Sequence, residues 1–120
     1  MGRDQDPLVR QQLATIIIND RVARYTNLRA MAKIAVGQLP GPEMSLAKLS
    51  LTANMVRTYE LVSSVLGPAL VADTGAWGTY AWTEFLLGVP GMRIAGGSDE
   101  VMRNIIGERV LGLPKEPAPS

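Results

Sequence analysis

From Leu8 to Val36 the chain contains no proline or glycine, and this stretch constrains the fold more than any other. Its apolar residues recur at spacings of three and four, the periodicity of one face of an α-helix. The triplet Ile16-Ile17-Ile18 would suit a strand by itself, but the residues on both sides keep the helical spacing. Asp6 and Pro7 supply an N-cap and a residue pre-set for the first helical position. The stretch therefore predicts a helix of about 30 residues, roughly 45 Å long.

A second long helix is predicted after a turn. Residues 37–42 include Gly37, Pro40, Gly41 and Pro42, so this segment cannot continue a helix and lets the chain run back antiparallel. The second helix is expected from about Glu43 to Leu66, where Gly67-Pro68 ends it. Apolar residues lie on two of its sides, so it needs neighbours within the chain and also from outside it. One side carries Met44, Ala47, Leu51, Met55, Val62 and Leu66, and the other carries Leu46, Leu49, Ala53 and Val56.

Glycine and proline interrupt the C-terminal half more often. Residues 69–78 are expected to form a loop, and a shorter third helix is expected from Thr79 to Leu87, closed by Gly88-Val89-Pro90-Gly91. Trp77 and Trp82 are expected to anchor a core or an interface. With a fourth helix after Ser98, the predicted fold is all-α: a bundle of two long antiparallel helices plus two shorter ones over residues 1–113. A proline-rich tail follows at 114–120.

Composition excludes several classes of function. A chain of 120 residues corresponds to one domain, and its net charge of +1 indicates no basic face for nucleic acid. Cysteine and histidine are both absent, which removes disulfides, thiol nucleophiles, histidine bases and the usual zinc ligands. No apolar run reaches the roughly 18 to 20 residues of a membrane span, and the polar N-terminus is unlike a signal peptide. A soluble cytoplasmic protein is expected.

The stretch most informative about function is a glycine elbow that leads into the fourth helix. Gly96 and Gly97 allow backbone conformations closed to other residues and a close approach by another molecule, while Ser98 is placed to cap the helix. Asp99 and Glu100 fall in the first turn, where negative charge suits the helix dipole. Free amides at such a helix start either bind an anionic cofactor or are simply solvated, and the residues alone leave both alternatives open.

Several motifs together resemble a known family. After the Gly-Gly-Ser elbow the chain reads Glu-Val-Met-Arg-Asn-Ile-Ile at 100–106 and Glu-Arg-Val-Leu-Gly-Leu-Pro at 108–114. Asp-Pro-Leu-Val-Arg-Gln-Gln-Leu-Ala stands at 6–14, Arg-Tyr-Thr-Asn-Leu-Arg-Ala at 24–30 and Pro-Glu-Met-Ser-Leu-Ala-Lys at 42–48. These motifs resemble bacterial acyl-CoA dehydrogenases, and the resemblance covers nearly the whole chain. It implies the C-terminal four-helix bundle of such an enzyme without its first helix.

The resemblance also implies a reaction and its participants. Such enzymes bind FAD between domains and subunits of a tetramer, remove the α-hydrogen of an acyl-CoA as a proton and pass the β-hydrogen as hydride to the flavin. The implied partners are the acyl-CoA substrate, the other subunits of a homo- or hetero-tetramer joined through the helical bundle, and an electron-transfer flavoprotein. The implied cofactor-binding residues are Ser64, Leu66, Gly67, Gly97, Ser98 and Glu100, and the implied substrate-binding residues are Ala95 and Gly96.

The base that removes the proton has no obvious counterpart here. Many relatives carry a glutamate at the position of Gly96, so no side chain is assigned as catalytic, although the backbone amide there can still polarise the thioester carbonyl. Other relatives place the base on the first helix of the bundle or pair a base-containing subunit with a base-free one, and the sequence does not choose between these arrangements. Asp99 or Glu100 would serve as a displaced base only if burial raised its pKa.

Three functional hypotheses follow. The first is a domain of an FAD-dependent acyl-CoA dehydrogenase that is inactive in isolation. The second is a non-catalytic partner subunit or interaction bundle of a hetero-oligomeric acyl-CoA dehydrogenase. The third is a plain helical bundle that binds no ligand.

Overall fold

The computed structural model describes residues 2–39, 41–77 and 80–115, and these residues form helices and loops without strands. The two long helices are α1 (Pro7–Ala35) and α2 (Glu43–Leu66), and the two shorter ones are α3 (Ala81–Ile94) and α4 (Asp99–Arg109). Short 3-10 helices, η1 (Arg3–Gln5) and η2 (Gly67–Leu70), precede α1 and follow α2. The all-α fold predicted from the sequence is confirmed. Most of the predicted proline-rich tail, residues 116–120, lies outside the described residues.

The ends of the long helices follow the predicted capping signals. The Asp6 side chain accepts a hydrogen bond from the Leu8 amide at 2.9 Å, and Pro7 occupies the first helical position. At the same end of the helix pair, α2 stops where Gly67 adopts a φ of 50°, a conformation that favours glycine. Local side-chain chemistry is therefore sufficient to set these boundaries.

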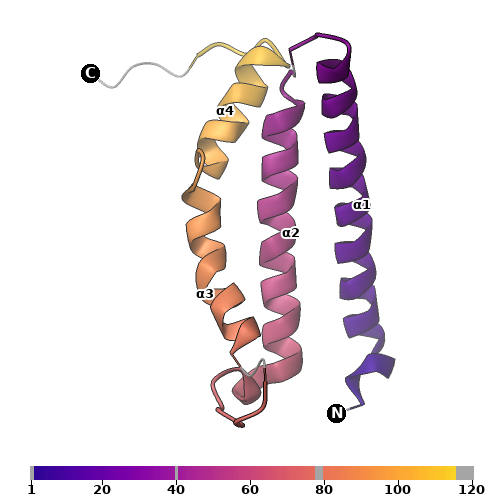
Figure 1. Cartoon of the computed structure of the whole chain (residues 1–120), viewed down its shortest axis with the longest axis vertical. Coiled ribbons are helices and arrows are strands. Elements are labelled where there is room, and N and C mark those ends of the chain that lie inside the picture. Colours follow the sequence, from indigo (N-terminus) through magenta and orange to yellow (C-terminus); the bar gives the residue numbers. More distant parts are fainter. Residues whose placement is uncertain (1, 40, 78–79, 116–120) are drawn as a thin grey trace, which may run out of the picture.

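The helices form an open layer with α2 in the middle. Figure 1 shows α1 antiparallel to α2 on one side, while α3 and α4 follow one another along the other side. The connection between α3 and α4 thus lies beside the N-terminal half of α2, where Lys48 on α2 contacts the elbow. The described part of the chain is therefore a layer in which α1, α2 and the α3–α4 pair lie side by side.

The third helix is longer than predicted. It begins at Ala81, and instead of ending at Leu87 it continues through Gly88–Gly91 to Ile94. Pro90 lacks an amide and leaves the carbonyl four residues earlier without its usual helical partner. Val89 is only 3% exposed, which shows that packing holds this segment helical. The prediction that Gly88–Gly91 closes the helix is therefore wrong, because tertiary packing outweighs local propensity.

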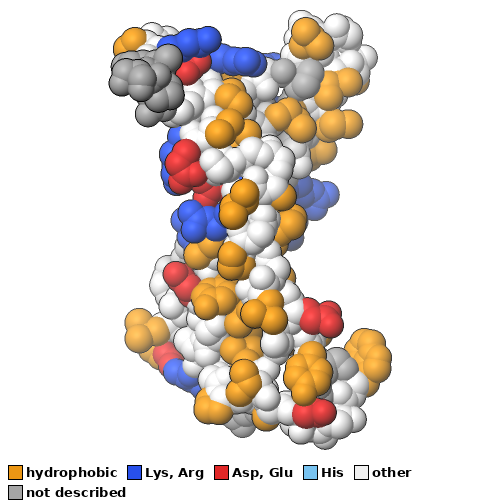
Figure 2. Space-filling model, turned by 90° about the vertical axis from the view of Figure 1, so that its left-hand side faces the viewer, with side chains coloured by type: hydrophobic (Ala, Val, Ile, Leu, Met, Phe, Trp, Pro, Cys, Tyr) orange, Lys and Arg blue, Asp and Glu red, His pale blue; other side chains and the backbone are white. Residues whose placement is uncertain are grey.

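Little of the chain is buried. Among the described residues only Ala30, Leu61 and Val89 form a buried apolar core, and Ser45, Thr52 and Asp99 are the buried polar residues. Figure 2 looks onto the α3–α4 side and shows apolar side chains spread along the whole length of that face. The expectation that α2 carries more apolar surface than its neighbours within the chain can cover agrees with the exposure of Met44, Leu46 and Leu51. An isolated layer of this kind has a weak hydrophobic driving force.

The two tryptophans differ in environment. Trp82 contacts Phe85 edge to face, with ring centroids 5.9 Å apart. Trp77 is fully exposed in the loop before α3, so a core role for it within this chain is wrong, and an interface role stays a prediction. The loop places its side chain beyond the packed part of the layer. No helix in the described ranges is long and apolar enough to cross a membrane.

Candidate functional site

The elbow between α3 and α4 is built from two consecutive glycines with positive φ. Gly96 has a φ of 68° and Gly97 a φ of 104°, both in the region that favours glycine. A Cβ at Gly96 would meet nothing within 4 Å, whereas a Cβ at Gly97 would lie 2.5 Å from the Cε atom of Met102. The chain can therefore turn sharply here, and Gly97 is required by its backbone conformation, whereas the Met102 methyl group is the end of a flexible side chain that can move aside.

Ser98 caps α4, as the sequence predicts. Its Oγ atom accepts a hydrogen bond from the Val101 amide at 3.4 Å, and its carbonyl accepts from the Met102 amide at 3.0 Å. The amides of Gly96 and Ser98 donate to no acceptor within the described part of the chain, whereas the turn at Ala95 and Gly96 directs the Gly97 amide back toward the end of α3. Free N–H groups next to a helix start are suited to binding an anion.

Asp99 directly follows Ser98, and its buried side chain binds side chains from two other helices. Its carboxylate accepts a hydrogen bond from the Arg93 Nε at 2.8 Å and from the Thr52 hydroxyl at 3.1 Å, and its side chain is 8% exposed. Arg93 comes from the last turn of α3 and Thr52 from α2, so this one carboxylate joins three helices. The cluster fixes the start of α4 against the centre of the layer.

Lys48 on α2 also contacts the elbow. Its ammonium group donates to the carbonyl of Arg93 at 3.1 Å and to the carbonyl of Gly97. The first contact places a cation at the C-terminus of α3, where it also stabilises the helix dipole. The second contact holds the elbow peptide directly.

The two carboxyl groups near the elbow remain ionised. The hydrogen bond from Arg93 lowers the pKa of Asp99 more than its burial raises it, and Thr52 and Lys48 lower it further. Hydrogen bonds from its own backbone amide and from the Ser98 hydroxyl lower the pKa of Glu100. A displaced base would need a raised pKa, so neither residue fits the role of general base. Asp99 is instead a structural ion-pair partner.

The remaining predicted site residues fall into two separate groups. Ala95, Gly96, Gly97, Ser98 and Glu100 meet at the elbow, beside an open pocket of about 310 Å³. That pocket is lined by Pro90, Arg93, Ile94, Ser98, Asp99 and Glu100.

The other group, Ser64, Leu66 and Gly67, lies at the C-terminal end of α2. Ser64 donates from Oγ to the Leu61 carbonyl at 2.8 Å, and its own carbonyl accepts a hydrogen bond from Arg3. This group lies more than four helical turns beyond Lys48, roughly 24 Å along α2.

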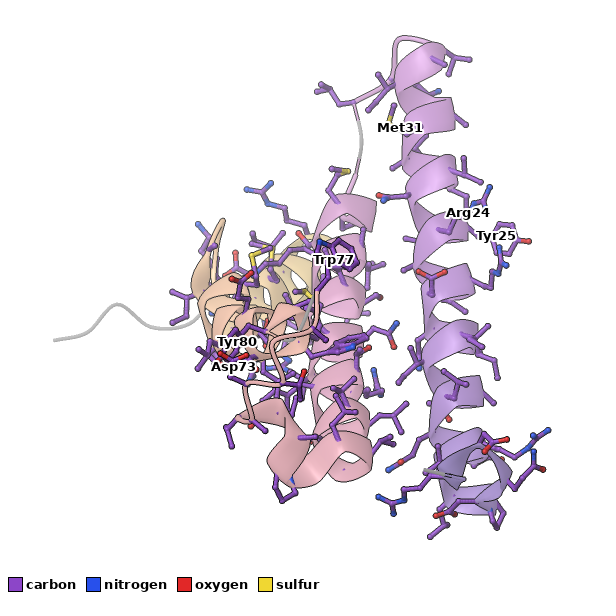
Figure 3. All side chains as sticks on the ribbon, turned by 60° about the horizontal axis from the view of Figure 1, so that its bottom comes forward. Arg24, Tyr25, Met31, Asp73, Trp77 and Tyr80 are labelled. Carbon is purple, nitrogen blue, oxygen red and sulfur yellow. The ribbon has the colours of Figure 1, made fainter. Side chains whose placement is uncertain are left out.

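Other surface features lie outside these two groups of residues. An apolar groove of about 310 Å³ runs between α1 and α2 up to Trp82 and is lined by Val9, Leu13, Ile16, Thr58, Leu61, Val62, Val65, Leu66 and Trp82. Figure 3 shows Asp73 and Tyr80 close together in the loop before α3, and Arg24 and Tyr25 pointing from α1 away from α2. Within the described ranges, no group of acidic side chains is arranged to hold a metal ion.

Comparison with known proteins identifies the family. The family model described as "Acyl-CoA dehydrogenase, C-terminal domain" matches residues 3–111. The chain belongs to the acyl-CoA dehydrogenase family. Two proteins named acyl-CoA dehydrogenase IpdE1 are each 37% identical to it: that of Mycobacterium tuberculosis over 119 residues, 92% of this chain, and that of Mycolicibacterium smegmatis over 121 residues, 96% of this chain. No solved structure gives a significant match.

The acyl-CoA dehydrogenase domain described above is short relative to these curated relatives. It spans 28% of the length of each. The family match covers η1 and all of α1 to α4, so the elbow and the end of α2 both lie within the matched region.

Sequence reasoning located the elbow of this acyl-CoA dehydrogenase domain but missed its supports. Lys48, Thr52 and Arg93 were not predicted as site residues, yet all three contact the elbow or Asp99. The signal available for Lys48 was its place at the end of one of the family-like motifs. Nothing in the spacing of Thr52 or Arg93 indicates that they share a partner, because Thr52 is 47 residues from Asp99 in the chain.

Proposed function

We propose that this chain forms the C-terminal helical domain of an FAD-dependent acyl-CoA dehydrogenase and is inactive in isolation. The observation that carries the proposal is the elbow of a family member with unpaired amides at Gly96 and Ser98, where Ser98 also lines an open pocket. The proposed reaction is the α,β-dehydrogenation of an acyl-CoA thioester. An electron-transfer flavoprotein is the proposed acceptor of the electrons.

The elbow suits the anionic part of FAD. The amide of Ser98 would hold a phosphate oxygen at the positive end of α4, in a pocket that Arg93 also lines. Glu100 lines the same pocket and has a lowered pKa, so its carboxylate would repel phosphate and suits a ribose hydroxyl instead. When bound, FAD supplies the acceptor for the substrate's β-hydrogen as hydride.

The domain's contribution to the thioester chemistry is proposed to come from Gly96. Its amide is unpaired and its position is exposed, so it can donate to the thioester carbonyl and stabilise the negative charge that develops when the α-proton leaves. No carboxylate at the elbow has a raised pKa, and we therefore place the base outside this chain. Ala95 is exposed at the end of α3 and leaves room on the substrate side.

The proposed site is completed by other chains or domains. The small buried core and the exposed apolar faces of α1 and α2 favour assembly through the helical layer. Ser64, Leu66 and Gly67 are too far from the elbow along α2 to support the same phosphate group. We propose that they contact the adenine part of a flavin bound by a neighbouring subunit in a homo- or hetero-tetramer.

The test is to purify the protein from its native source in its native assembly and to measure flavin absorbance before and after adding acyl-CoA. Bound flavin that is bleached anaerobically by an acyl-CoA supports the proposal. An assembly that purifies without flavin and does not take up added FAD contradicts it.

A second candidate function is a non-catalytic partner subunit of a hetero-oligomeric acyl-CoA dehydrogenase. Many relatives carry a glutamate at the position of Gly96, and its replacement by glycine here favours the partner role. Native mass spectrometry separates the two candidates. A complex in which flavin leaves together with a different polypeptide, and never with this one, supports the partner role.

A further inference from the structure

Lys48 contacts the peptide between Gly97 and Ser98. The Gly97 carbonyl accepts a hydrogen bond from the Lys48 ammonium group, so this carbonyl points toward α2. The peptide bond between Gly97 and Ser98 is trans, as all described peptide bonds are, and the N–H of a trans peptide points opposite to its C=O. The Ser98 amide therefore points away from α2, out of the layer.

The same lysine also ties the elbow to the helix before it. Lys48 donates to the Arg93 carbonyl at 3.1 Å, and the Arg93 side chain holds Asp99 at 2.8 Å on the far side of the elbow. The two glycines would otherwise leave this turn with wide conformational freedom. With both its ends and its central carbonyl held, the turn is pre-organised before any ligand arrives.

We infer that Lys48 is a positioning residue that orients the Gly97–Ser98 peptide so that the Ser98 amide faces a bound anion. The inference rests on the proposed function for the identity of that anion, the diphosphate of FAD. Lys48 acts through the backbone and has no contact with the ligand in this scheme. Asp99 secures the opposite end of the elbow through Arg93 and Thr52.

The first arm of the test measures amide hydrogen exchange in the full chain by NMR. Lys48→Met removes both hydrogen bonds and keeps the aliphatic stem, whereas Lys48→Arg keeps the charge and the donors. Because hydrogen bonds to charged donors are strong, K48M is expected to speed exchange at Met102, the first amide bonded to Ser98, by about tenfold or more. K48R is expected to restore slow exchange, and Lys115→Met serves as the matched control at an exposed lysine.

Exchange at Tyr25 on α1 separates local from global effects. A rise at Met102 that leaves Tyr25 unchanged supports the inference. If Met102 and Tyr25 rise by the same factor in K48M and in the milder Lys48→Gln variant, Lys48 contributes only general stability and the inference is overturned. No change at Met102 overturns it as well.

The second arm uses the native assembly and measures its affinity for FAD. K48M is expected to weaken FAD binding by about tenfold, K48R to stay within about threefold of the unchanged protein, and K115M to have no effect. Equal affinity in K48M and the unchanged protein overturns the inference. If the unchanged assembly binds no FAD at all, the proposed function fails, and the exchange measurements still decide whether Lys48 positions the elbow.

Discussion

Arg93 and Asp99 form an ion pair across the elbow, with 2.8 Å between the Arg93 Nε and the Asp99 Oδ2 atoms. Arg93 belongs to the last turn of α3 and Asp99 to the first turn of α4, so each also complements the dipole of its own helix. The pair links the two helices on either side of the elbow and lines the open pocket together with Ser98. Four testable predictions follow from this arrangement and from the contacts around it.

Replacing Asp99 with asparagine is expected to lower the free energy of unfolding by about 1–2 kcal/mol, because the ion pair and its charge-assisted hydrogen bond are lost while Arg93 stays half-exposed to water. Urea unfolding followed by circular dichroism measures the change. Asp20→Asn, at an exposed position on α1, is the control and should leave the stability unchanged. Equal effects at the two positions would contradict a special role for Asp99.

Stability should depend on pH through Asp99. Its folded-state pKa is lowered, mainly by the Arg93 hydrogen bond, so the stabilisation is fully present above the ordinary aspartate pKa and is lost as the pH falls through the lowered one. The difference in unfolding free energy between the unchanged protein and D99N should therefore shrink from about pH 5 to about pH 2. Denaturant titrations at several pH values give this difference. A constant difference would show that the carboxylate charge is irrelevant.

Substituting alanine at the two elbow glycines should have unequal effects. Gly96→Ala is expected to cost about 1 kcal/mol from its positive φ alone, since its Cβ meets open space. Gly97→Ala should cost more, about 2 kcal/mol or above, because its φ of 104° lies beyond the small left-handed region that alanine can enter. Met102→Ala should recover little of the loss at Gly97 and none at Gly96, because the end of Met102 can move aside, and a double-mutant cycle by chemical unfolding measures this.

Asn54 joins the two long helices, donating from Nδ2 to the Ile16 carbonyl at 3.1 Å. Asn54→Ala is expected to lower the free energy of unfolding by about 1 kcal/mol. This is at the low end for a hydrogen bond to the backbone, because the substitution also removes the Asn54 Oδ1 atom, which is buried without a partner. Exchange of the α1 amides against those of α4 checks the effect, which should be confined to α1. Asn27→Ala, at an exposed position on α1, is the comparison and should leave α1 protected as before.

Much of the helical layout could be predicted from local chemistry. The Asp6-Pro7 start of α1, the Gly67-Pro68 end of α2 and the Ser98 cap of α4 all stand where the sequence predicts them. Each depends on a residue and its neighbours within about one helical turn, so it can be read without knowing the fold. The family resemblance, carried by contiguous motifs, is confirmed for the same reason.

The sequence alone determined the helices, the glycine turn and the family, because each is encoded by residues close together in the chain. Only the tertiary structure decided that α3 passes through Pro90, since the packing of Val89 outweighs a local helix breaker. It also decided that Asp99 is a buried ion-pair partner with a lowered pKa rather than a candidate base. That outcome depends on α2 bringing Lys48 and Thr52 beside an elbow more than forty residues away in the chain.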